Sequence, residues 1–254
     1  MVKVLDLFRL DDKVAIVTGA SSGLGVSFAI ALAEAGAGLV LAARRIDKLK
    51  DTARAVEAAG RSVLVVQTDV SDPLACTDLA QRAMDTFGRI DILVNNAGVA
   101  TAVGATRETP EQFRNVIDVN LNGAYWVAQA CGRVMKPGSS ITNISSVLGI
   151  TTAGLPQAAY SASKAGLIGL TRDLAQQWTG RKGIRVNALA PGFFHSEMTD
   201  AYPPGYLDAQ LARIPAGRTG DPQELAATLV YLTSDAAGYV IGQVLAVDGG
   251  MTVT

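Results

Sequence analysis

Seven short runs rich in valine, isoleucine, leucine and alanine recur along the chain, and they constrain the fold more than any other feature. Most of them lack a polar residue at every second position, which is typical of strands covered on both faces of a sheet. Between them the apolar residues recur three and four positions apart, which indicates helices. This alternation predicts a parallel sheet with right-handed helical crossovers. The runs are VAIVT (14–18), LVLAA (39–43), SVLVVQ (62–67), DILVNN (91–96), SSITNIS (139–145), IRVNALA (184–190) and GQVLAV (242–247).

No low-complexity linker or shift in composition interrupts this alternation. We therefore expect residues 1–254 to form a single doubly wound α/β domain with about seven parallel strands flanked by helices. The longest irregular stretch covers residues 191–218, directly after the sixth run. Open parallel sheets bind ligands beyond the carboxyl ends of their strands, and long loops there are usually functional. The sequence thus predicts a mobile substrate lid over residues 191–218.

The charge balance excludes some classes of partner. The chain carries 22 basic and 23 acidic residues, so no broad field attracts nucleic acid or an anionic membrane. Asp6, Arg9 and Asp11 interrupt the apolar N-terminus, which argues against a signal peptide. No stretch of about 18 uncharged apolar residues occurs either. We expect a cytoplasmic protein that acts on a small molecule.

Neither the cysteines nor the histidine suggest metal chemistry. Cys76 and Cys131 lie in segments with helical spacing, without a CxxC pair or clustered histidines, and are expected to be buried, reduced thiols. His195, the single histidine, has no companion ligands and falls in the predicted lid. The sequence predicts no metal site.

The stretch TGASSGLG (18–25), between the first run and a helical segment, allows two chemical interpretations. Residues 19–23 match G-x-S-x-G, the nucleophile elbow of an α/β-hydrolase. That mechanism would have to recruit His195, and the elbow would stand on the first strand with no oxyanion-hole loop before it. Glycines in this place also let a pyrophosphate approach the amides of the next helix N-terminus. We favour the phosphate interpretation.

Further motifs follow in order: NNAG (95–98), VNL (119–121), YSASK (160–164), PG (191–192) and a C-terminal GQVLAVDGG (242–250). Together with the glycine stretch they resemble the short-chain dehydrogenase/reductase family, in its compact form of about 250 residues. The resemblance covers nearly the whole chain. It implies a Rossmann-like domain, a nicotinamide cofactor across the strand ends and a homotetramer.

By this resemblance, Asp69 and Val70 hold the adenine, Asn95 braces that region, and Ser196 bonds the nicotinamide carboxamide at a place where the family usually has threonine. The other cofactor-binding residues that it implies are Gly19, Ser21, Ser22, Gly23, Leu24, Gly25, Ala97, Gly98, Tyr160, Lys164, Pro191 and Gly192.

The end of the second run indicates which cofactor is bound. An acidic side chain there would accept hydrogen bonds from the ribose of NAD and repel the extra phosphate of NADP. The residue at this position is Ala43, followed by Arg44 and Arg45. A guanidinium group suits a phosphate because it donates parallel, charge-assisted hydrogen bonds. We therefore expect NADP(H), rather than NAD(H), with Arg44 on the phosphate.

Hydride transfer to a ketone requires a proton donor, and Tyr160 is the candidate. A free tyrosine has a pKa of about 10, so useful acid–base chemistry near pH 7 requires about 4 kcal/mol of anion stabilisation. One ammonium group at ~4 Å supplies about that much at an effective dielectric constant of ~20. Lys164 lies four residues on, one helical turn away and on the same face.

Ser146 matches the family serine that bonds the carbonyl oxygen. The adjacent Ser145 is an alternative because 13 residues separate Ser146 from Tyr160, one more than is commonest. We favour Ser146, because the family serine directly precedes the Val-Leu-Gly stretch. Asn120 matches the family asparagine that holds a water behind the lysine. Residues 161–164 also read S-x-x-K, as in penicillin-binding enzymes, but neither Ser-Asp-Asn nor Lys-Thr-Gly follows. We discard that interpretation.

These features predict an NADP(H)-dependent oxidoreductase that interconverts a ketone and a secondary alcohol, with Tyr160 as general acid and base. The substrate stays open between small cyclic, sugar-like or hydroxylated carbonyl compounds and a 3-oxoacyl thioester carried by acyl carrier protein. A non-catalytic sensor of NADPH is an alternative of another class, although such a protein would be expected to lose the tyrosine or the lysine.

Overall fold

A parallel sheet of seven strands forms the centre of the molecule, in the order β3-β2-β1-β4-β5-β6-β7. The structure is a computed structural model and describes residues 3–195 and 205–253. The sheet confirms the α/β fold predicted from the apolar runs. The strands are β1 (Val14–Thr18), β2 (Gly38–Ala43), β3 (Val63–Gln67), β4 (Ile92–Asn95), β5 (Ser140–Ile144), β6 (Arg185–Pro191) and β7 (Val244–Val247).

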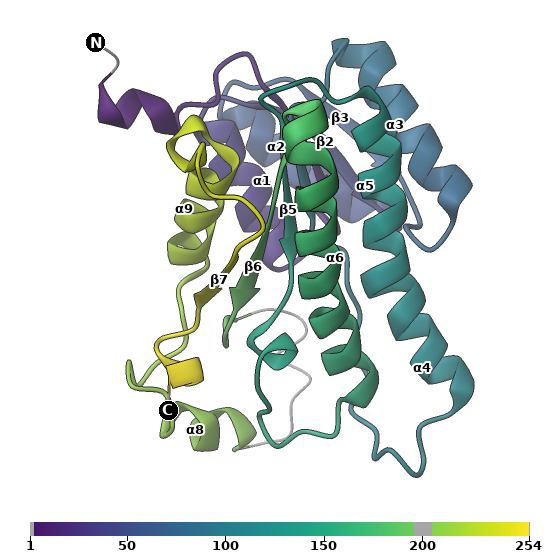
Figure 1. The fold of residues 1–254 in the computed structure, drawn as a ribbon, viewed down its shortest axis with the longest axis vertical. Coiled ribbons are helices and arrows are strands. Elements are labelled where there is room, and N and C mark those ends of the chain that lie inside the picture. The colour runs from purple at the N-terminus through teal and green to yellow at the C-terminus, as the bar shows by residue number, and fades with distance from the viewer. Residues whose placement is uncertain (1–2, 196–204, 254) are drawn as a thin grey trace.

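Helices cover both faces of the sheet, as uniformly apolar strands require. Figure 1 shows α5 and α6 in front of the sheet, with α1 and α2 behind it. Successive residues of β1 serve the two sides in turn: Val17 packs in the core that holds Phe28, and Ile16 in the core that holds Leu79. The helices are α1 (Leu24–Glu34), α2 (Ile46–Ala58), α3 (Pro73–Phe87), α4 (Pro110–Ile117), α5 (Gly123–Val134), α6 (Ala158–Lys182), α8 (Tyr206–Leu211) and α9 (Pro222–Thr233).

The strand order reverses at β1, which pairs with β2 on one side and with β4 on the other. A crevice forms at such a reversal, because the connections from the two central strands leave in opposite directions. The arrows of β6 and β7 point toward the end of the molecule where α8 and the carboxyl terminus lie (Figure 1). The loops after the strands therefore gather at that end, and this positions the site.

Part of the stretch expected to be irregular is ordered. Within residues 191–218 the structure has the helix α8, whose Tyr206 hydroxyl donates a hydrogen bond of 2.7 Å to the Ala153 carbonyl. The Tyr206 ring also meets the Phe193 ring edge-on, with centroids 6.1 Å apart. Residues 196–204 lie outside the described residues.

Both cysteines are buried and unpaired, Cys76 in α3 and Cys131 in α5. Burial away from water raises the pKa of each thiol to about 12. They are therefore structural residues, as predicted.

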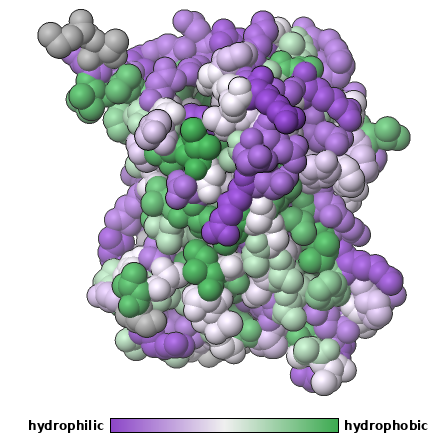
Figure 2. Space-filling model, in the orientation of Figure 1, coloured by the Kyte–Doolittle hydropathy of each residue, from purple (hydrophilic) through white to green (hydrophobic). Residues whose placement is uncertain are grey.

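The visible surface in Figure 2 is largely hydrophilic, with hydrophobic residues in separate patches. One patch belongs to the N-terminal 3-10 helix (Val4–Phe8), next to the N-terminus. No helix in the described parts of the chain is long and apolar enough to span a membrane.

Candidate active site

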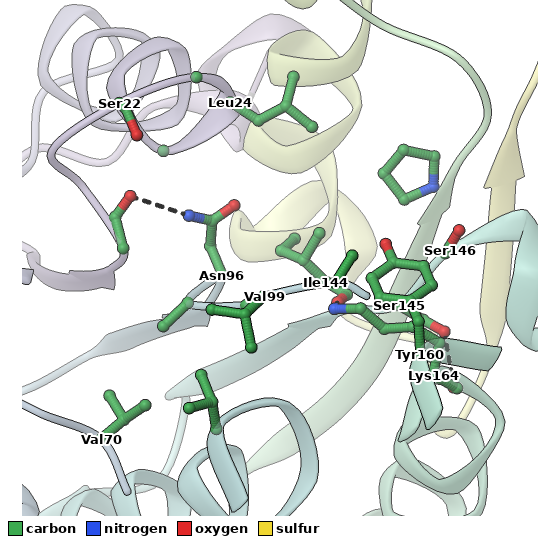
Figure 3. Close-up of a pocket in the computed structure, with 18 of the residues that line it drawn as sticks. Ser22, Leu24, Val70, Asn96, Val99, Ile144, Ser145, Ser146, Tyr160 and Lys164 are labelled. Carbon is green, nitrogen blue, oxygen red and sulfur yellow. Dashed lines mark hydrogen bonds between the residues drawn. The ribbon is translucent and has the colours of Figure 1, made fainter. Parts of the chain in front are cut away.

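A pocket of about 640 Å³ lies along the carboxyl ends of the strands. It brings together most of the residues that the sequence singled out. Figure 3 shows its two sides, with Ser22 and Leu24 at one side and Ser146, Tyr160 and Lys164 at the other. The predicted site residues that line it are Gly19, Ser21, Ser22, Gly23, Leu24, Gly25, Arg44, Asp69, Val70, Ala97, Gly98, Ser146, Tyr160, Lys164, Pro191 and Gly192.

The glycine stretch is shaped by close packing as well as by the pocket. A Cβ on Gly25 would lie 2.3 Å from the Gly19 carbonyl oxygen and 2.7 Å from the Asn96 amide nitrogen. Gly19 has a φ of +67°, and a Cβ there would lie 2.8 Å from the Ala97 Cα. Both positions therefore require glycine. The loop is held tightly against the end of β4.

The first backbone N–H groups of α1 have no acceptor within the helix. Gly23 precedes the helix with φ 55° and ψ −138°, a region open essentially to glycine, and no side chain caps the helix. Gly23, Leu24 and Gly25 line the pocket. Unpaired amides at a helix N-terminus bind anions, so the loop fits a pyrophosphate group.

Thr18 and Asn96 tie β1 to β4 beside this loop, and the sequence analysis missed both. The Thr18 hydroxyl oxygen accepts hydrogen bonds from the Asn96 and Ala97 backbone amides, at 3.0 and 3.1 Å. The Asn96 side chain donates to the Thr18 and Gly19 carbonyls, at 2.9 and 3.2 Å, and Figure 3 draws one hydrogen bond from this side chain. The signal was present in the NNAG motif, whose second asparagine lines the pocket.

Asn95, the first asparagine of that motif, does not line the pocket. Its side-chain amide donates to the Ala124 carbonyl at 3.0 Å and to the Asn143 side-chain oxygen at 2.9 Å. It is 4 % exposed and joins β4, β5 and α5 inside the core. Asn95 was expected to brace the adenine region, and its hydrogen bonds stabilise the core beneath the pocket instead.

Arg44 and Arg45 approach the cofactor side of the pocket in different ways. Arg45 donates hydrogen bonds to the Ser22 and Ser21 hydroxyls, at 2.7 and 3.4 Å. Arg44 is exposed, lines the pocket and is one cause of the lowered pKa of Asp69, after the hydrogen bonds from Ser71. Two cations and two hydroxyls therefore border the place beyond β2 where an extra phosphate would lie.

Lys164 is the best-defined functional group in the pocket. Its ammonium donates a hydrogen bond of 2.7 Å to the Ile144 carbonyl and lies 5.5 Å from the centroid of the Tyr160 ring. The side chain is buried, which lowers the pKa of Lys164 from 10.5 to about 8. It is therefore a cation below about pH 8, close to the ring of Tyr160.

The structure distinguishes the two neighbouring serines. The Ser145 hydroxyl donates to the Lys164 backbone carbonyl at 2.8 Å, so its proton is already used. The Ser146 oxygen accepts from the Leu148 amide at 3.1 Å, which leaves its own proton available. Figure 3 shows the Ser146 side chain on the same side of the pocket as Tyr160. Ser146 is thus the serine of the two whose hydroxyl proton remains available in the pocket.

Asn120 lies behind the pocket wall and is fully buried. Its side chain accepts from the Val99 amide at 2.8 Å and donates to the Val99 carbonyl at 2.9 Å and to the Ser163 hydroxyl at 3.0 Å. The residue belongs to a π-helical turn (Asp118–Asn122), in which the Gly123 amide bonds five residues back. The side-chain amide of Asn120 is thus engaged with the protein.

Gly192 and Phe193 close the pocket after β6. A Cβ on Gly192 would lie 2.8 Å from the Asp248 Cα, so the loop after β7 packs directly on it. His195 is exposed and does not line the pocket. Ser196, predicted to bond the nicotinamide, lies outside the described residues. Within the described ranges no three His, Cys, Asp or Glu side chains are grouped to hold a metal ion.

Comparisons with known proteins agree with this geometry. The family model described as Enoyl-(Acyl carrier protein) reductase matches residues 19–252. A galactitol 2-dehydrogenase (L-tagatose-forming) from Cereibacter sphaeroides is 42 % identical over 253 residues, covering 97 % of this chain and 98 % of the relative. The 3-oxoacyl-[acyl-carrier-protein] reductase FabG of Thermotoga maritima is 38 % identical over 248 residues, covering 96 % and 100 %.

Among solved structures, one from Beutenbergia cavernae, described as an NAD(P) dependent gluconate 5-dehydrogenase with NADP bound at low occupancy, superposes with a TM-score of 0.91. It is 38 % identical, and the match covers 98 % of this chain and 100 % of that one. The chain belongs to the short-chain dehydrogenase/reductase family. It is an oxidoreductase of CH–OH and carbonyl groups that uses a nicotinamide cofactor.

Proposed function

We propose that the protein is an NADP(H)-dependent oxidoreductase that interconverts a ketone and a secondary alcohol, with Tyr160 as the general acid and base. The observation that carries the proposal is the buried Lys164 ammonium, 5.5 Å from the Tyr160 ring centroid and in the same pocket as Ser146. A buried cation favours the ionised form of a neighbouring phenol. It therefore suits a tyrosine that must give and regain a proton.

Each of the three side chains has a defined task in the proposed reaction. Ser146 directs its free hydroxyl proton at the substrate oxygen, because its own oxygen is held by the Leu148 amide. Tyr160 delivers the proton to that oxygen during reduction and removes it during oxidation. Lys164 stabilises the phenolate that remains. The nicotinamide, when bound, supplies or accepts the hydride at the substrate carbon.

The residues on the other side of the pocket fit a dinucleotide. The uncapped amino end of α1 and the glycine loop offer backbone amides to the pyrophosphate. Arg44 and Arg45 favour the additional phosphate of NADP, and the NADP in the relative from Beutenbergia cavernae supports that choice. A glycine-lined cradle with two guanidinium groups beside it is consistent with this cofactor.

Relatives suggest two substrate classes, and the pocket favours a small carbonyl compound. Besides the reductase FabG of Thermotoga maritima, the similar proteins include the galactitol 2-dehydrogenase. The substrate end of the pocket is mostly apolar, and its described lining residues offer no arginine or histidine to an acidic carrier. A 3-oxoacyl thioester reductase is the second candidate, because the same apolar lining also suits an acyl chain. An NADPH sensor would bind cofactor without turnover.

The test follows the absorbance of NADPH, with NADH in parallel, across ketones that include an acetoacetyl thioester. We expect turnover with NADPH, and we expect Arg44→Ala to weaken NADPH binding much more than NADH binding. Equal effects on both cofactors would overturn the NADP assignment. Tight NADPH binding without turnover of any compound would establish the sensor instead.

The lid, the homotetramer and the cytoplasmic location stay predictions. The contacts of α8 with Ala153 and Phe193 support a segment that covers the substrate end. A groove between α5 and α6, where Gly132 lies under the Trp178 ring, offers a surface for a second copy. Light scattering tests the assembly, and the mass of one subunit would contradict the tetramer.

A further inference from the structure

Gln157 is a buried polar residue whose side chain has no task in the protein interior. It lines the active-site pocket directly before α6 and is 5 % exposed. Its side-chain carbonyl oxygen is fully buried and finds no hydrogen-bond partner among the described residues. Leaving such a group unpaired costs about 1–3 kcal/mol. Because the residue also lines the pocket, a bound molecule can supply the missing hydrogen bond.

The position of Gln157 gives no structural reason for a glutamine. It is the residue that caps α6, where serine, threonine, aspartate and asparagine are preferred, yet its side chain makes no capping hydrogen bond. Its backbone carbonyl accepts from the Ser161 amide, a bond that any residue could make. Exchanging the side chain thus leaves the helix start intact.

The residues that share this end of the pocket limit the chemistry of the ligand. Most of the lining is apolar, and besides Ser146 and Tyr160 few polar groups face the substrate. The charged residues of the described lining are Arg44, Arg45 and Asp69 beyond β2 and β3, and Lys164, which is bonded to Ile144. Because the one cation described at this end, Lys164, is bonded to the Ile144 carbonyl and lies beside Tyr160, this end favours a neutral molecule with one polar group besides the reacting carbonyl.

We propose that Gln157 binds a hydroxyl group of the substrate next to the reacting carbon, so that the substrates are neutral hydroxy ketones and vicinal diols. This inference rests on the proposed function and names its substrate class. Gln157 stands three residues before Tyr160 in the chain, and both residues line this pocket. The reacting oxygen goes to Tyr160 and the neighbouring hydroxyl to Gln157.

A hydroxyl matches this amide better than a thioester does. The terminal amide turns about a soft, roughly two-fold torsion, so either its oxygen or its nitrogen can face the pocket. A hydroxyl donates to the oxygen or accepts from the nitrogen. A thioester carbonyl can only accept, and leaves the amide oxygen without a donor.

The experiment measures NADP⁺ reduction with trans-1,2-cyclohexanediol and with cyclohexanol, which differ by one hydroxyl group. Oxidation moves a hydride from carbon to NADP⁺ and a proton from oxygen to Tyr160, and yields 2-hydroxycyclohexanone or cyclohexanone. We expect the wild type to prefer the diol about tenfold in kcat/KM, the effect of one hydrogen bond. Gln157→Met should bring the ratio close to one. The matched control, Gln81→Met, changes an exposed glutamine of α3 and should keep the wild-type ratio.

The ratio of two substrates in one sample does not depend on the fraction of folded enzyme, so a partly unfolded variant remains informative. A wild-type ratio near one, or an unchanged ratio in Gln157→Met, would overturn the inference while the proposed function stands. A second result would also overturn the inference: Gln157→Met loses tenfold in kcat/KM for an acetoacetyl thioester but keeps the wild-type preference for the diol over cyclohexanol. The Gln157 amide would then bind the thioester substrate. Absence of turnover by the wild type with every alcohol and thioester would overturn the proposed function, and this inference with it.

Discussion

Burying the Lys164 ammonium should make the active site a source of instability. Its pKa falls from 10.5 to about 8 because the folded protein removes the ammonium from water. Between these two values the unfolded chain binds a proton that the folded chain has released. The free energy of unfolding should therefore rise with pH across this window, and the full destabilisation should persist below pH 8.

The variant Lys164→Met isolates this effect, because methionine fills a similar volume without a charge. At 1.36 kcal/mol per pKa unit, the shift corresponds to about 3 kcal/mol. The variant also leaves the Ile144 carbonyl without its donor, a loss that does not vary with pH. We therefore expect the stability of the variant relative to the wild type to fall by about 2–3 kcal/mol between pH 7 and pH 10.

Urea denaturation of the cofactor-free proteins at the two pH values measures this difference. The buried thiols of Cys76 and Cys131, with raised pKa values, lower the stability above about pH 9 in both proteins, so their contribution cancels. The same relative stability at both pH values would refute the reasoning, because Lys164 would then keep its ordinary pKa in the fold. The variant should also lose turnover.

Four further substitutions test the packing and the serine assignment. Gly25→Ala places a Cβ 2.3 Å from the Gly19 carbonyl oxygen and should lower the free energy of unfolding by about 1–3 kcal/mol, which thermal melting measures. The variant should also bind NADPH more weakly, which a cofactor titration measures. Ser146→Ala should lower kcat/KM by about 10² or more with little change in melting temperature. Ser145→Ala should instead lower the free energy of unfolding by about 1 kcal/mol, because its hydrogen bond to the Lys164 carbonyl is lost. The reverse pattern would exchange the roles of the two serines. Thr18→Val leaves two backbone amides without an acceptor and should cost about 2 kcal/mol or more, and unchanged melting would contradict this.

The sequence predicted the sheet well because its apolar runs are long and distinct. It also predicted that Tyr160 and Lys164 lie together, because residues four apart share one face of a helix. The sequence predicted that the glycine loop binds a phosphate, but not that close packing within the protein also requires glycine there. Only the packed fold shows that Gly19 and Gly25 meet each other and Asn96.

Adjacent residues of the same type were harder to assign. In an extended chain successive side chains point to opposite sides, so a one-residue uncertainty exchanges the core for the pocket. This is why the motif pointed to Asn95, which lies in the core, while Asn96 lines the pocket. The same ambiguity made Ser145 an alternative to the predicted Ser146, and their hydrogen bonds distinguish the two.

Gln157 could be found only from the structure. Nothing in its local sequence marks it, because a glutamine before a helix is an ordinary surface residue in most proteins. Its significance depends on burial and on an unpaired oxygen, which follow from the way the loop before α6 packs over the pocket.

The most direct test of the central claim is the rate of NADPH oxidation by Tyr160→Phe, with a ketone that the wild type reduces. The phenyl ring keeps the packing of Tyr160 but has no proton to give. We expect a loss of turnover by several orders of magnitude, with NADPH affinity close to that of the wild type. Turnover at a comparable rate would contradict it and remove Tyr160 from the reaction.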